Sequence, residues 1–163
     1  MSISLKRIYK FAVPESEEME IKMKKGIKVL YYFVLSVSML VGLWHFFVPK
    51  MFRWYDYLPM QYENLIVGID WTNYCFSAFL FGTSLLLIIL GKKVLSFKSD
   101  SIYFYYFLTA VWGFRAMLAL FIEPWPLQPI PAAAIGQLCA SVTVFILMLI
   151  VGIIFIKETK CKK

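Results

Sequence analysis

The chain has few of the residues from which metal and redox centres are built, with one histidine and three cysteines among 163 residues. A single histidine excludes bis-histidine haem ligation within the chain and disfavours a histidine-rich metal site. The cysteines form neither a C-x-x-C pair nor a zinc-binding spacing. Nucleophile motifs, glycine-rich phosphate loops and nucleotide fingerprints are also missing. The sequence therefore predicts no metal site and no catalytic residue, and it leans against an enzyme.

Long apolar runs are what the chain has instead. Hydrophobic residues make up 61% of it and charged residues 17%, a balance that excludes an ordinary soluble domain. Four runs match the ~30 Å hydrocarbon layer, and in lipid each must be helical to satisfy its own backbone. The expected spans are residues 29–48, 69–90, 101–122 and 132–156. The predicted fold class is an all-α, transmembrane, antiparallel four-helix bundle. Cys75 and Cys139 fall within spans, where we expect small core residues.

Lysine and arginine are unevenly distributed around these runs. They crowd the juxtamembrane segment 1–28, the loop between the second and third runs and the tail 157–163. The first loop has only Lys50 and Arg53, and the third loop has neither lysine nor arginine. The positive-inside rule therefore predicts that both termini are cytoplasmic. We expect a multi-pass protein of a bacterial cytoplasmic (inner) membrane with lipids as partners, and not a nucleic-acid binder.

Arg115 is the most informative single residue, because it lies within the third apolar run. A guanidinium in hydrocarbon is costly, so it normally faces a protein interior or a wet cavity and finds a partner there. Counting residues outward from the cytoplasmic end of each run places polar residues from all four helices at a similar depth, in the outer third of the bundle. The candidate ligand-binding residues are Arg115, His45, Asp70, Asn73, Glu123 and Gln137.

Two hypotheses for this cluster stay open. In the first, Arg115 pairs with Asp70 or Glu123 and His45 bonds a neighbour, which only fixes the packing. In the second, the cluster lines an outward-open pocket for a polar or anionic headgroup. Arg115 would be the anion anchor, and His45 could relay protons near neutral pH. Partners from another chain are a further alternative.

Two local patterns predict further detail of the bundle. Phe47, Met51, Trp54 and Leu58 recur at helical spacing after the first run, which predicts a short helix lying flat on the outer surface. Small residues spaced by four let helix backbones approach closely. They are Ser38 and Gly42 in the first run, and Ala132, Gly136 and Ala140 in the fourth.

The end of the first run, GLWHFFVPKMF, resembles the pattern that closes the first helix of DoxX-like membrane proteins. The resemblance falls on His45, Phe46, Pro49 and Phe52, and the four-span layout is similar over residues 29–156. It implies a non-catalytic or accessory subunit that binds a lipid, a quinone-like molecule, a partner membrane protein or a second copy. A subunit of a membrane redox enzyme is one alternative, although the chain lacks paired cysteines. A small-solute transporter is another, which the apolar inner halves of the second and fourth runs disfavour.

Overall fold

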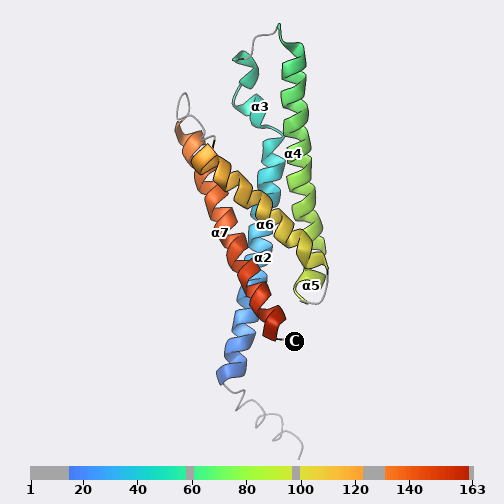
Figure 1. Ribbon diagram of the computed structural model, residues 1–163, viewed down its shortest axis with the longest axis vertical. Helices are drawn as coiled ribbons and strands as arrows, with labels where there is room; N and C mark the ends of the chain where they lie inside the picture. The colour runs from blue at the N-terminus through green and yellow to red at the C-terminus, as the bar shows by residue number, and fades with distance from the viewer. Residues whose placement is uncertain (1–14, 58–60, 97–99, 123–130, 162–163) are drawn as a thin grey trace, which may run out of the picture.

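A computed structural model describes residues 15–57, 61–96, 100–122 and 131–161, and all regular structure within them is helical. The long helices are α2 (Glu15–His45), α4 (Glu63–Ile89), α6 (Ser101–Met117) and α7 (Pro131–Cys161) (Figure 1). The short elements are α3 (Val48–Met51), η1 (Trp54–Asp56), α5 (Gly91–Val94) and the π-helical turn η2 (Leu118–Ile122), which continues α6.

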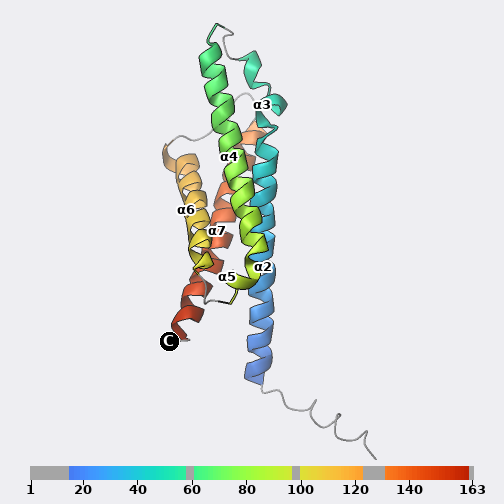
Figure 2. The ribbon, with the colours of Figure 1, turned by 90° about the vertical axis from the view of Figure 1, so that its right-hand side faces the viewer.

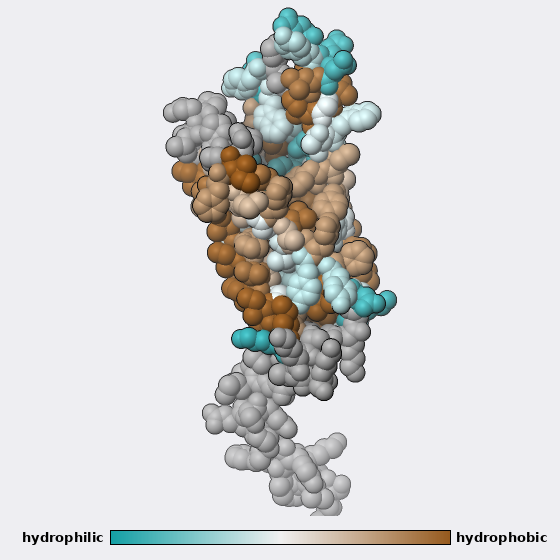
Figure 3. Space-filling model, in the orientation of Figure 1, coloured by the Kyte–Doolittle hydropathy of each residue, from teal (hydrophilic) through white to brown (hydrophobic). Residues whose placement is uncertain are grey.

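Four helices are long and apolar enough to cross a membrane, which confirms the predicted all-helical, multi-span character. Their apolar parts are Lys25–His45, Glu63–Ile89, Ser101–Ile122 and Ala134–Lys157. The second begins at Glu63 rather than at residue 69. Mostly apolar surface covers the middle of the face drawn in Figure 3, and hydrophilic surface lies toward both ends.

The four long helices pack side by side. α2 lies against α4 and α7, α6 against α7, and α4 against α6 (Figures 1 and 2). We call the end of the bundle where α2 ends and α4 begins the His45 end, and the opposite end the α5 end. The buried apolar residues gather toward the α5 end, where Tyr31, Leu87, Tyr105 and Phe155 are fully enclosed. Toward the His45 end the buried residues become polar.

Hydroxyl groups inside the bundle bond to helix carbonyls. Ser77 and Thr109 donate to the carbonyls four residues earlier, at 2.6 and 2.8 Å. Tyr31 donates across the bundle to the carbonyl of Leu87 at 2.7 Å. Among the residues described, no buried side-chain nitrogen or oxygen lacks a partner. The polar groups are therefore compatible with a water-free interior.

The small residues of α2 behave as expected, and those of α7 do not. A Cβ added at Gly42 would lie 2.6 Å from the backbone nitrogen of Phe81, so α2 and α4 touch there. Ser38 and Ser84 join the same two helices through hydroxyls 2.8 Å apart. No atom lies within 4 Å of a Cβ added at Gly136, which is exposed. The predicted close approach of α7 through Gly136 is therefore wrong.

The expected core positions of Cys75 and Cys139 are also wrong, because both are free cysteines exposed on the outside of the bundle. In lipid the outer face of a helix is as apolar as the inner face, so apolar sequence does not indicate which side faces the core. In the first connection, α3 and η1 replace the single flat helix that the aromatic spacing predicted, and Pro49 lies in the first turn of α3. Leu58, the third loop and residues 1–14 lie outside the described residues.

Candidate functional site

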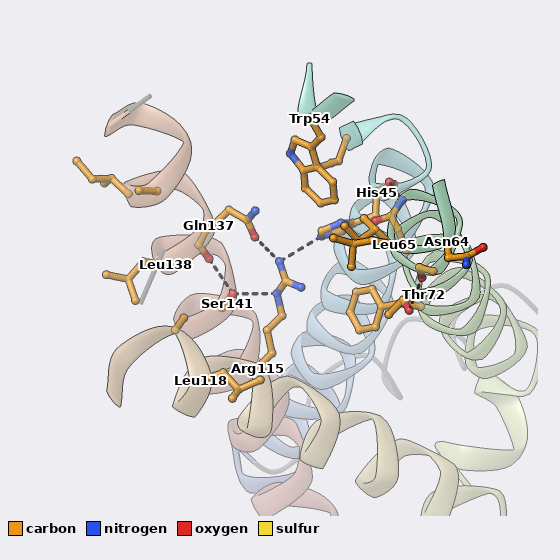
Figure 4. Close-up of a pocket in the computed structure, with 18 residues that line it drawn as sticks. His45, Trp54, Asn64, Leu65, Thr72, Arg115, Leu118, Gln137, Leu138 and Ser141 are labelled. Carbon is orange, nitrogen blue, oxygen red and sulfur yellow. Dashed lines mark hydrogen bonds between the residues drawn. The ribbon is translucent and has the colours of Figure 1, made fainter. Parts of the chain in front are cut away.

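A cavity of about 890 Å³ opens at the His45 end, between α4 on one side and η2 and α7 on the other. In Figure 4, Leu118 and Leu138 stand on one side and Leu65 and Thr72 on the other, with the guanidinium of Arg115 between them. Its polar lining residues are His45, Trp54, Asn64, Thr72, Asn73, Arg115, Gln137 and Ser141. Apolar side chains make up the rest of the wall.

Arg115 is half-buried and connects three helices. Its Nε donates to Ser141 Oγ at 3.1 Å, and its Nη2 bonds both Gln137 Oε1 and, at 3.1 Å, His45 Nε2 (Figure 4). The guanidinium carbon also lies 5.6 Å from the ring centre of Phe76 and 5.8 Å from that of Trp112. Such aromatic faces stabilise a cation that has lost its water.

The bond between Arg115 and His45 sets the proton of the imidazole. A guanidinium has only donors, so His45 Nε2 must accept and the ring proton must be on Nδ1. The ring is held edge-on to Phe76 at 5.5 Å, and the His45 carbonyl accepts from Asn73 Nδ2 at 2.9 Å. Protonating Nε2 would break the bond and place two cations side by side. The arrangement therefore argues against a proton relay and makes His45 a neutral partner of the guanidinium.

The two carboxylates considered as partners of Arg115 have different outcomes. Asp70 is not among the residues that line the cavity. Its carboxylate instead accepts a hydrogen bond of 2.6 Å from the hydroxyl of Tyr55. Glu123 lies outside the described residues. Within those residues, the hydrogen-bond partners of Arg115 are all neutral. The positive charge in this cavity is therefore held by dipoles and aromatic faces rather than by a described carboxylate.

The bond to Asp70 raises the pKa of Tyr55 to about 12 from its ordinary 10.0, with partial burial as the second cause. The contribution of this hydrogen bond to the stability of the fold is fully present below pH 10 and is lost as the pH rises through about 12. Because Tyr55 is partly in solvent, Tyr55→Phe should lower the free energy of unfolding by only ~0.5–1 kcal/mol at neutral pH. Difference titration of tyrosinate absorbance, wild type minus variant, should show a midpoint near 12. A midpoint near 10 would contradict the bond.

Sequence reasoning missed several residues of the wall. Ser141 lies one turn after Gln137 on α7, and Phe76 lies one turn after Asn73 on α4, so helical spacing alone could have added both. Trp54 depends on the path of the first connection, in which Arg53 adopts a left-handed conformation with φ of 51°. No signal in the sequence predicts that turn, since arginine rarely adopts it.

No protein-family model, curated protein or solved structure matches this chain. Among the described residues, no three histidine, cysteine, aspartate or glutamate side chains are grouped so as to hold a metal ion. As far as the described residues show, the cavity is a mainly apolar space with one cation and a set of neutral acceptors at its inner end.

Proposed function

We propose that this chain is a DoxX-like integral membrane protein, non-catalytic or accessory to a larger complex, whose cavity binds an amphipathic lipid or quinone-like molecule. The observation that carries the proposal is Arg115, a permanent cation in a mainly apolar cavity of about 890 Å³, bonded to neutral groups. Ligand pockets typically combine apolar walls with a few convergent polar groups, and this volume is within their usual range of ~300–1,000 Å³.

The proposed topology is an antiparallel, up-and-down bundle in a bacterial cytoplasmic membrane, with both termini inside and the cavity toward the outer surface. Its support is the exposed lysines that gather at the α5 end. They are Lys25, Lys28, Lys92, Lys93 and Lys157. A green fluorescent protein fused after Lys163 should fluoresce, because it folds only in the cytoplasm. A dark fusion that is nevertheless inserted would contradict this orientation.

A binding site fits better than a conducting path. Below the cavity, the interior is filled by a packed cluster that includes Tyr31, Tyr105, Met148 and Phe155. The Tyr31 and Tyr105 rings lie 5.5 Å apart, and Tyr105 donates to the Met148 carbonyl at 2.9 Å. Through the part of the bundle that the structure describes, these packed and hydrogen-bonded side chains leave no continuous polar route toward the α5 end.

Filling the cavity tests the proposal directly. Gly68 lines the cavity, and a Cβ added there meets no atom within 4 Å, so Gly68→Leu should occupy cavity space without straining α4. The matched control is Gly82→Leu on the same helix, which is equally unhindered but lies outside the cavity. Both changes remove a helix-interior glycine and should preserve or slightly raise stability.

The readout is native mass spectrometry with lipid extraction, on protein taken from the membrane in polymer-bounded lipid discs. Wild type and Gly82→Leu should retain a bound amphiphile that Gly68→Leu has lost. The proposal fails if all three proteins carry the same molecules in the same amounts. A quinone or a chromophore in the extract would instead favour the alternative of a redox-enzyme subunit.

A further inference from the structure

The cavity has a different chemistry at each end. On α4, Leu65 and Ile69 lie nearer the His45 end and Asn73 nearer the α5 end, and the same order holds for Leu118 and Arg115 on η2 and α6. The distance along α4 from Leu65 to Asn73 is ~12 Å. The space is therefore a mainly apolar shaft with a polar floor, which is its deeper end within the bundle. Asn64 near the mouth and Thr72 near the floor are the polar residues of its α4 wall above Asn73.

At the floor, Arg115 has unused hydrogen-bond donors, and the described residues that line the cavity include no carboxylate to pair with its charge. Arg115 donates from its Nε to Ser141, and from its Nη2 to His45 and Gln137. Its Nη1 has no hydrogen-bond partner among the residues described. The amide of Asn73 is engaged with the carbonyl of His45 at 2.9 Å. A ligand reaching the floor therefore meets a guanidinium edge with two free N–H groups and a full positive charge.

The kind of head group follows from the free N–H groups and the positive charge of Arg115, which favour a hydrogen-bond acceptor that is also an anion. A neutral carbonyl, as on a quinone, would accept a hydrogen bond but would leave the charge uncompensated. A carboxylate or phosphate oxyanion would accept from Nη1 and neutralise the charge at once, and such charge-assisted bonds are roughly twice as strong as neutral ones. An apolar tail seated in the shaft would displace water from above the floor, which would strengthen the attraction further.

We infer that the ligand is an amphiphile with an oxyanion head, a carboxylate or a phosphate, bound at Arg115 Nη1 with an apolar tail along the shaft. This inference rests on the proposed function, and it selects an anionic lipid over a neutral quinone. The tail contributes through burial, so each methylene enclosed by the shaft should tighten binding about fourfold until the shaft is filled. The head contributes about tenfold to a hundredfold, the range for one hydrogen bond between charged groups.

The test uses wild-type protein in phosphatidylcholine discs and two probes that differ in the head alone, dodecanoate and dodecan-1-ol. Calorimetric titration at a pH where the carboxylate is ionised measures both, and discs holding Gly68→Leu give the signal from partition into the lipid. Dodecanoate should bind at least tenfold more tightly than the alcohol after that subtraction. Dodecyl phosphate should compete with it, whereas acetate and inorganic phosphate should not.

Each outcome has a distinct meaning. Equal affinity of the acid and the alcohol would overturn the oxyanion head but leave an amphiphile-binding cavity. Competition by acetate or inorganic phosphate as strong as that of dodecyl phosphate would overturn the tail and indicate a site for free anions. If neither probe binds above the lipid background, and the purified protein carries no amphiphile, the proposed function itself fails.

Discussion

Gly42→Ala is expected to destabilise the bundle by ~1–3 kcal/mol or more, the cost of overpacking an interior that cannot relax. The new Cβ would lie 2.6 Å from the backbone nitrogen and 3.0 Å from the Cα of Phe81. Backbone atoms cannot rotate away as a side chain can, so α2 and α4 would have to separate. Their separation would also stretch the hydrogen bonds between Ser38 and Ser84 and between Tyr31 and Leu87, which cross the same interface.

Gly82→Ala is the matched control, since the substitution is the same and the helical setting is similar. A Cβ at Gly82 meets nothing within 4 Å. The gain in helix propensity should therefore appear undiminished, as a stabilisation of ~0.5–1 kcal/mol. Thermal unfolding in one detergent, followed by circular dichroism, compares the two variants with wild type. Shifts of the same sign for both alanines would refute the close contact at Gly42.

The spans could be predicted from the sequence because the membrane imposes a length and a backbone rule. An apolar run whose length matches the hydrocarbon thickness must be helical whatever its residues. The frequent valine and isoleucine therefore do not indicate β-strands. Depth follows from the same count, at 1.5 Å per residue. That is why four of the polar residues placed at a similar depth by this count line one cavity, namely Arg115, His45, Asn73 and Gln137. Asp70, placed by the same count, does not line it.

Facing direction could not be predicted in this way. A helix in lipid is apolar on both its inner and its outer side, so no polar stripe marks the surface. Gly42 and Gly136 illustrate the difficulty, since both belong to small-residue patterns but only Gly42 touches a neighbouring backbone. Cys75 and Cys139 point outward for a reason that their sequence context does not contain.

The partner of Asp70 was beyond sequence reasoning for another reason. Asp70 bonds to Tyr55 because the first connection turns back over the start of α4, with a left-handed residue at Arg53. Such a conformation costs energy in a residue with a side chain and follows no local rule. The consequence for the site is large, since one of the two expected counter-charges of Arg115 is committed elsewhere.

Arg115→Met separates the two roles that the guanidinium could have. Methionine keeps most of the apolar reach of the side chain but removes the charge and all the donors. Losing the donors leaves acceptors on His45 and Gln137 unpaired, at ~1–3 kcal/mol for each such group. Removing the charge acts in the opposite direction, because an arginine at the centre of a membrane helix costs ~2.5–3.5 kcal/mol on insertion scales. These terms oppose each other, so the net change in the free energy of unfolding should lie between a gain of ~1.5 kcal/mol and a loss of ~3.5 kcal/mol.

Binding should respond quite differently to the same substitution. Affinity for dodecanoate should fall about tenfold to a hundredfold, and the preference over dodecan-1-ol should disappear, because the alcohol never used the charge. Arg53→Met is the control, as it removes an arginine that is 78% exposed and paired with Asp56 outside the cavity lining. It should leave the preference for the acid intact. If Arg115→Met folds and still prefers the acid, the anion is held by another group. If Arg115→Met unfolds the protein, the expected range of the change in stability is wrong and the guanidinium serves the packing of three helices.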